Sequence, residues 1–353
     1  MGKTKKEDLN QFLIAHLNTI YDTLHKLFLQ LFERTASPTE EKVNWNDVLQ
    51  MSDHLSRQAT IVGMLWSGEA PKAESLKETM ESYFNALQGF LLCCHGSTVG
   101  AGPTLSSLIH LSVKKIVDSS FRLLQGSVSL YEGSYEKDKK PSIPQLSGAV
   151  WEACSSFKKV PATNITAIGR AITQVAVSMK DVLREMKEVK PASPEDDDDD
   201  EDDDDLGNDL SPEEMEVAQM VAEIVSETII VIKELIRVIT GMIKLENPKD
   251  NSGFVDSLEK LLKLCKGTGD QIDEIGACVY PPQEIVKMKQ ALKIIQGNFD
   301  EVESEVEGLK SASEAFTGAC GKLRNTMKHM EGELDKRCED EVVAEMQNVT
   351  LGS

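Results

Sequence analysis

The chain has 353 residues, of which 59 are Asp or Glu and 38 are Lys or Arg, so its formal net charge is −21. A hydrophobic fraction of 40% is enough to build a folded core and excludes global disorder. A length above roughly 250–300 residues favours two domains. The acidic surplus disfavours general binding to nucleic acid, because it repels phosphate.

The acidic surplus is concentrated in one part of the chain. Residues 1–190 carry 22 basic and 20 acidic side chains, a net charge of +2, whereas residues 206–353 carry a net charge of −12. Between them, Glu195–Asp205 is an unbroken run of eleven carboxylates. Charges at this density repel one another and cannot collapse into a packed element. We therefore predict an N-terminal helical bundle over 1–190, an acidic disordered linker over 191–210 and a C-terminal helical bundle over 211–353.

The N-terminal part is predicted to hold five or six helices, because apolar residues recur at spacings of three and four. An amphipathic pattern predicts the first helix over Asp8–Arg34, and Asn44 or Asn46 can cap the second. Pro103 fits the first turn of a fourth helix. Further helices are predicted around Leu76–Leu91, Gln145–Lys159 and Asn164–Val189.

The C-terminal part is predicted to hold four helices. Ser211-Pro212-Glu213-Glu214 indicates a helix start, with a Ser cap, Pro in the first position and carboxylates at the positive end of the helix dipole. The β-branched run Ile229–Ile232 favours a strand by propensity, but the length of the segment and its interspersed charges favour a helix. The other helices are predicted over about Phe254–Ala277, Ile285–Leu309 and Ser313–Met346.

No segment shows the alternation of a strand, so the predicted fold class is all-α, with two antiparallel bundles joined by the acidic linker. The sequence contains none of the common hydrolase, metalloprotease or nucleotide-binding signatures, and we predict a protein that is not an enzyme and needs no cofactor. The chain lacks an apolar signal segment and an uninterrupted apolar stretch of about 18–20 residues. We therefore expect an intracellular protein that does not insert into membranes.

Two segments resemble small-ligand sites but have a simpler explanation. Cys93-Cys94-His95 could suggest metal ligands, yet neighbours on a helix point about 100° apart, so buried thiols near a helix end are the better interpretation. Gly96–Thr104 could cradle phosphate, but it has no Lys at the Walker position and no preceding strand. A turn between two helices is predicted there. None of the seven cysteines forms a CxxC pair, which excludes a zinc ribbon.

The segment from Pro212 to Ala277 also has the form of a helix–loop–helix. A DNA-binding member of that class needs a basic stretch entering the first helix, and here no Lys or Arg precedes Lys233. Two interpretations remain. The segment could pair with transcription factors and block their contact with DNA, or it could be two bundle helices joined by an ordinary loop, which is the simpler.

The acidic run and the Ser-Pro pairs on either side of it are the candidate partner-binding or regulatory positions. The carboxylates could bind a basic surface, although such runs are more often solvated spacers. Ser193 and Ser211 each precede Pro, as in proline-directed phosphorylation sites, but capping alone explains Ser211. The candidate residues are Ser193, Glu195, Asp196, Asp200, Glu201, Asp205 and Ser211.

Several motifs together resemble those of one known family. They are Gly63–Pro71 followed by Gly96–Thr104, then Val150–Cys154, Pro161–Asn164 and Lys180–Met186. With the acidic run and the all-helical C-terminal half, the chain resembles the cyclin-D-interacting (cyclin-D-binding) protein family over nearly its full length. That family is similar in architecture to the helical bundles of vinculin and α-catenin.

The resemblance implies a binding protein that restrains the cell cycle. Members bind D-type cyclins and lower phosphorylation of retinoblastoma protein by the cyclin-dependent kinase. They thereby lower the S-phase transcription that retinoblastoma protein controls. They are described as helix–loop–helix proteins without a basic region and are placed in both cytoplasm and nucleus. Two other functions are left open by the residues alone: a scaffold of the adhesion or cytoskeleton type, and an acidic chaperone for basic proteins.

Overall fold

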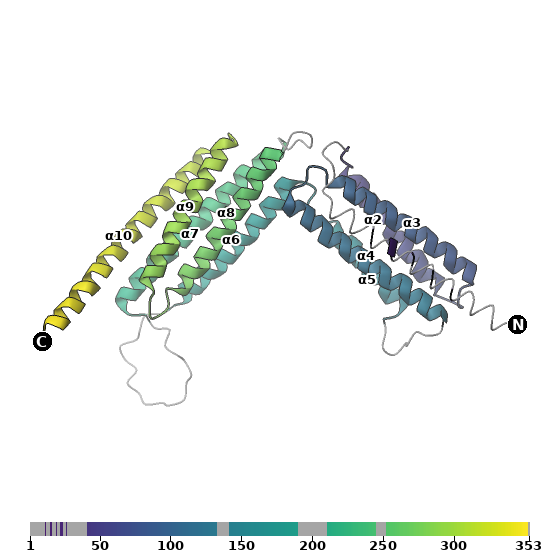
Figure 1. Ribbon diagram of the computed structural model, residues 1–353, viewed down its shortest axis with the longest axis horizontal. Helices are drawn as coiled ribbons and strands as arrows, with labels where there is room; N and C mark the ends of the chain where they lie inside the picture. The colour runs from purple at the N-terminus through teal and green to yellow at the C-terminus, as the bar shows by residue number, and fades with distance from the viewer. Residues whose placement is uncertain are drawn as a thin grey trace, which may run out of the picture. The chain divides into compact units, whose positions relative to one another are not determined.

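The computed structural model describes residues 41–132, 141–189, 210–244 and 252–351, with six isolated positions between 11 and 26; side chains beyond 337 are not included (Figure 1). Within this part the chain forms nine α-helices, one short 3-10 helix and no β-strand, which confirms the predicted all-α class. The predicted first helix lies outside the described residues, apart from the six isolated positions, which are helical and exposed.

The chain divides into two compact units, residues 1–167 with 247–252 and residues 168–246 with 253–353. The helices of the first unit are α2 (Trp45–Leu65), α3 (Ala73–Ser97), α4 (Pro103–Glu132) and α5 (Ile143–Phe157). Those of the second unit are α6 (Asn164–Glu188), which begins at the end of the first, α7 (Pro212–Gly241), the 3-10 helix η1 (Met242–Lys244), α8 (Ser252–Ala277), α9 (Ile285–Gly308) and α10 (Glu314–Leu351).

The division falls within α6 and not at the acidic run, where the sequence analysis put it. The body of α6 packs against α8: a Cβ built on Gly269 would lie 3.1 Å from Cγ1 of Val175, and one on Gly276 would lie 2.7 Å from Cγ1 of Val182. The charge pattern therefore does not mark the packing boundary. The second unit has five described helices and the first has four, because α6 contributes its apolar face to the second.

The first unit is a ring in which α2 contacts α3, α3 contacts α4, α4 contacts α5 and α5 contacts α2. Asn44 caps α2 by accepting a hydrogen bond from the backbone N–H of Asn46, as predicted. At the centre, the buried hydroxyl of Tyr83 donates a hydrogen bond of 2.8 Å to Ser120. Phe157 stacks on Trp45 and meets Phe90 edge-on, so three aromatic rings from three segments of the chain close the core.

The turn between α3 and α4 is held from a distance by one side chain. The amide of Asn164 donates to the carbonyl of Gly100 at 2.9 Å and accepts from the backbone N–H of Gly102 at 2.8 Å. Gly100 has φ 69°, a conformation that glycine adopts without strain. The glycines between 96 and 104 therefore form a turn tied to the start of α6, which confirms the simpler of the two interpretations.

In the second unit, α10 packs against α7 and α9. The run Ile229–Ile232 is helical, with Val231 and Ile232 buried, so burial and length outweigh its strand propensity. Glu227 of α7 is almost fully buried and accepts a hydrogen bond of 2.7 Å from the ammonium group of Lys322 on α10. This ion pair joins the two helices.

Lys322→Met should lower the free energy of unfolding of the second unit, because the almost fully buried Glu227 would lose its partner where water cannot replace it fully. The effect stays below that of a fully buried pair because the Lys322 side chain is 64% exposed. Urea unfolding followed by far-UV circular dichroism measures it. The matched variant Lys328→Met, at an exposed site on the same helix, should change stability by less than about 0.5 kcal/mol. Equal effects of the two variants would contradict the role given to the pair.

Candidate functional site

Of the candidate residues, Ser193, Glu195, Asp196, Asp200, Glu201 and Asp205 lie outside the described residues. Ser211 is described and is the N-cap of α7. Its hydroxyl accepts a hydrogen bond of 3.2 Å from the backbone N–H of Glu214, and its own backbone N–H donates to the Glu214 carboxylate at 2.9 Å. The capping prediction is confirmed, while a regulatory role for any of these residues stays a prediction.

The thiols of the described part do not form a reactive or metal-binding centre. Burial raises the pKa of Cys94 well above its ordinary value and that of Cys265 to about 12. Both thiols therefore stay protonated near neutral pH, whereas nucleophilic attack and metal ligation need the thiolate. Over the described ranges, no group of three or more His, Cys, Asp and Glu side chains is placed to hold a metal ion.

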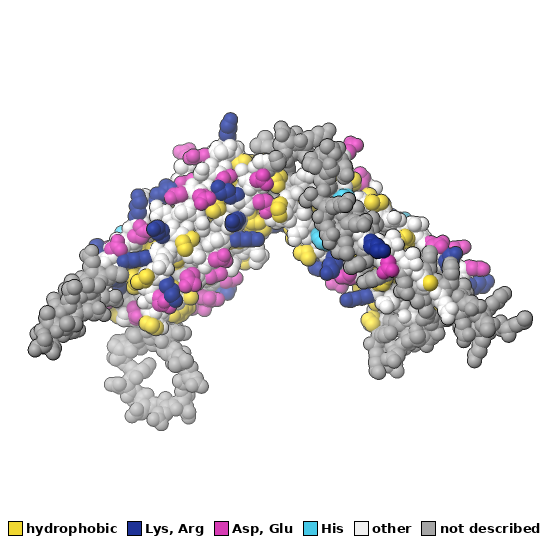
Figure 2. Space-filling view, in the orientation of Figure 1, with side chains coloured by type: hydrophobic (Ala, Val, Ile, Leu, Met, Phe, Trp, Pro, Cys, Tyr) yellow, Lys and Arg dark blue, Asp and Glu magenta, His cyan; other side chains and the backbone are white. Residues whose placement is uncertain are grey.

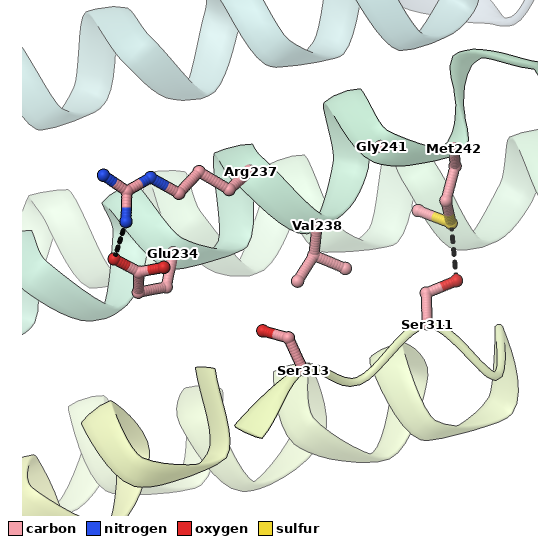
Figure 3. A pocket seen from close by; sticks show the side chains of 7 residues that line it. All are labelled: Glu234, Arg237, Val238, Gly241, Met242, Ser311 and Ser313. Atoms are coloured by element: carbon pink, nitrogen blue, oxygen red, sulfur yellow. Dashed lines mark hydrogen bonds and ion pairs between the residues drawn. The ribbon is translucent and has the colours of Figure 1, made fainter. Parts of the chain in front are cut away.

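A pocket of about 410 Å³ lies in the second unit where α7 ends and α10 begins (Figure 3). Its polar side chains already bond to neighbours: Arg237 pairs with Glu234, and the hydroxyl of Ser311 donates to the sulfur of Met242. The hydroxyl of Ser313 accepts a hydrogen bond from the backbone N–H of Phe316 at the start of α10. The Ser311–Met242 bond joins η1, directly after α7, to the segment before α10. Together the three bonds leave little to orient a small ligand. We therefore assign the pocket a structural role.

A more informative surface lies on the first unit, where α2 meets α5. Ile61 and Met64 of α2 are 47% and 67% exposed, and Trp151 of α5 is 45% exposed. The indole N–H of Trp151 donates a hydrogen bond of 3.1 Å to the hydroxyl of Thr60, which places the ring beside the same turn of α2. We call the surface formed by Arg57, Thr60, Ile61, Met64 and Trp151 the Trp151 surface.

A close approach of the two helices builds this surface. A Cβ on Gly63 would lie 2.9 Å from the hydroxyl of Ser147, so a larger residue at position 63 would have to displace the Ser147 side chain of α5. About two turns further along, Lys158, the C-cap of α5, pairs with Asp53 of α2 at 2.7 Å. The stretch of α5 that carries Trp151 is therefore held beside α2 by packing before it and by an ion pair after it.

The sequence alone does not mark this surface as a site. The buried stripe of α2 includes Val48, Leu55, Ala59 and Val62. Ile61 and Met64 lie off that stripe, and apolar residues outside a helix's buried stripe are the signal that could have found them. In the sequence Trp151 stands out only within the Val150–Cys154 motif of the family resemblance, and its proximity to α2 depends on the fold.

Two family models match the chain, Grap2 and cyclin-D-interacting, N-terminal, over residues 47–192 and Grap2 and cyclin-D-interacting, C-terminal, over residues 195–304. Together they cover well over half of the chain, in the order of their names. The chain belongs to the Grap2 and cyclin-D-interacting family. The chain is also 20% identical over 230 residues, 64% of its own length and 68% of the other protein's, to a Cyclin-D1-binding protein 1 homolog of Xenopus laevis.

The predicted resemblance is therefore confirmed, and the family is one of binding proteins. The two models of the Grap2 and cyclin-D-interacting family meet between residues 192 and 195, at the edge of the acidic run. The packing division lies inside α6 instead. In this member the N-terminal region of the family thus contributes a helix to the second packing unit.

The charge and apolar character of the described helices are relevant to binding of nucleic acid and to insertion into membranes. The first turn of α7 carries Glu213 and Glu214, so the start of the helix–loop–helix-like segment is acidic. On the face drawn in Figure 2, acidic and basic side chains are interspersed over the second unit, and no basic stripe is visible there. Among the described helices none has the length and apolar character needed to span a bilayer.

Proposed function

We propose that this protein is a non-enzymatic regulator that binds a D-type cyclin, alone or in its kinase complex. Binding lowers phosphorylation of retinoblastoma protein by the cyclin-dependent kinase. It thereby lowers the S-phase transcription that retinoblastoma protein controls. The observation that carries the proposal is the match of both Grap2 and cyclin-D-interacting family models, in order, over residues 47–192 and 195–304. The proposed site of action is the cytoplasm and the nucleus.

The described surfaces support a binding role. Exposed apolar side chains that gather around a Trp are typical of protein interfaces, and the Trp151 surface has this composition. Helix–loop–helix transcription factors are a second proposed class of partner. The acidic first turn of α7, with Glu213 and Glu214, supports pairing with such a factor without a contact to DNA, since carboxylates repel phosphate.

The proposal is tested by adding the purified protein to a D-type cyclin–kinase complex that phosphorylates retinoblastoma protein. We expect the initial rate to fall with increasing protein to a plateau, and the same protein to leave a kinase complex built on an unrelated cyclin unaffected. A rate that stays constant at saturating protein would contradict the proposal. An equal loss with the unrelated cyclin would show a non-specific effect and would contradict it as well.

A further inference from the structure

We propose that the Trp151 surface is the docking site for an amphipathic α-helix of the partner, which places apolar side chains on Ile61, Met64 and Trp151 and a carboxylate against Arg57. The inference rests on the proposed function only in taking a D-type cyclin as the first partner to test. It identifies the surface and the chemistry of the element that covers it.

The apolar centre of the surface is already ordered. Trp151 keeps its indole N–H bonded to Thr60, so its ring loses little freedom when a partner covers it. Ile61 and Met64 lie one turn apart on α2 and are exposed by 47% and 67%. Covering them removes apolar area from water, which favours association. A pre-ordered aromatic ring flanked by aliphatic side chains is the composition of an interface hot spot.

The charge beside this centre indicates an acidic partner. Arg57 is exposed one turn before Ile61, and none of the described residues forms an ion pair with it. The neighbouring cation Lys158 differs, because it is paired with Asp53 at 2.7 Å. Within the described ranges, Arg57 is thus a cation at the edge of the surface that takes part in no ion pair. A carboxylate on the partner would complement it and speed association at low salt.

The shape of the surface fits a helix. Arg57, Ile61 and Met64 follow the spacing i, i+4, i+7 and form one ridge along α2. Beside the same helix, towards α3, lies an open pocket of about 510 Å³ lined by Met51, His54, Ser82, Asn85 and Ala86. A partner helix lying along α2 would reach this pocket and the ridge together, with anchors at the spacings that helix-in-groove recognition uses.

The experiment compares variants of the full chain in binding to an immobilised D-type cyclin–kinase complex by surface plasmon resonance. Met64→Glu and Trp151→Ala change the apolar centre, and Arg57→Glu reverses the charge beside it. The matched control is Leu111→Glu, which introduces the same charge at a side chain of the first unit that is 57% exposed on α4. Circular dichroism and thermal unfolding establish that each variant is folded.

We expect Met64→Glu and Trp151→Ala to weaken binding at least about tenfold, as hot-spot substitutions do. Arg57→Glu should lower the association rate and reduce its salt dependence, while Leu111→Glu should bind within about twofold of the unmodified chain, as for a residue outside an interface. If the folded Met64→Glu and Trp151→Ala variants bind as tightly as the control, the inference is wrong while the proposed function stands.

A second arm does not depend on the cyclin. A stapled helical peptide with Leu at spacings of three and four and Glu on its flanks should shift the indole N–H resonance of Trp151, assigned with Trp151→Phe. The shift should be lost in Met64→Glu and should weaken when the Glu residues of the peptide are replaced by Lys. If the cyclin does not bind, the proposed function fails and this arm alone decides the inference. A Trp151 resonance unmoved by the peptide would overturn it.

Discussion

Phe157→Ala is expected to lower the free energy of unfolding of the first unit by about 3–5 kcal/mol, the range for removing a buried Phe side chain. Phe157 is fully buried, and its ring centroid lies 5.4 Å from that of Trp45 and 5.2 Å from that of Phe90. Truncation would leave a cavity at the junction of α5, α3 and the start of α2. Both aromatic contacts would be lost together.

Urea unfolding followed by tryptophan fluorescence measures this effect selectively. The chain has three tryptophans, and Trp45, Trp66 and Trp151 all lie in the first unit. The matched control is Trp151→Ala on the same helix, where the ring is 45% exposed. Its cost should be smaller than that of Phe157→Ala, because the exposed part of the ring contributes no burial that truncation could remove. A Phe157→Ala variant no less stable than this control would contradict the assignment of Phe157 to the core.

Asn164→Ala is expected to lower the stability of the first unit by about 1–3 kcal/mol, since it leaves the N–H of the buried Gly102 without its partner. Asn164 is 2% exposed and bonds both the carbonyl of Gly100 and the N–H of Gly102. Water can reach the carbonyl of the exposed Gly100, but the N–H of the buried Gly102 finds no new partner unless the turn between α3 and α4 opens. The variant should therefore loosen this turn first.

Hydrogen exchange at the amide of Gly102 measures that loosening directly. We expect Asn164→Ala to speed exchange at Gly102 much more than at buried amides in the middle of α4. The control is Asn85→Ala on α3, where no hydrogen bond of the amide side chain is described, and it should leave the Gly102 amide protected. Unchanged protection in Asn164→Ala would show that the turn does not depend on this side chain.

Helix positions could be predicted from the sequence because local chemistry decides them. Ser211 and Pro212 start α7 with the predicted cap, Asn44 caps α2 and Pro103 begins α4. Each of these signals satisfies or spares backbone groups at a helix end, independently of the rest of the fold. The strand-like run Ile229–Ile232 could likewise be assigned to a helix from local features, namely the length of its segment and the charges interspersed in it.

The assignment of helices to units could not be predicted in the same way. The apolar face of α6 would fit either bundle, and the charge pattern put the boundary after it. What decides the question is close packing between distant segments, such as Gly276 against Val182 and Gly269 against Val175. From the sequence alone, a glycine in a helix interior predicts a less stable helix. Here Gly269 and Gly276 allow α8 to approach α6 within an uninterrupted helix.

The Trp151 surface could not be predicted for a related reason. Trp151 lies 91 positions from Thr60, whose hydroxyl it bonds, and no sequence pattern predicts that contact. The composition of α2 offers only a partial signal, since Ile61 and Met64 lie outside its buried stripe. The candidate positions chosen from charge alone lie mainly in the acidic run, and of these only Ser211 is described.

The most direct test of the account is isothermal titration calorimetry of the full chain against a purified D-type cyclin–kinase complex. We predict saturable binding with one chain per cyclin and a negative heat-capacity change, because apolar area is buried. The Met64→Glu variant should give much weaker heats than the Leu111→Glu control. An absence of binding heat at several temperatures, with both proteins folded and concentrated, would contradict the claim that this member of the family binds a D-type cyclin.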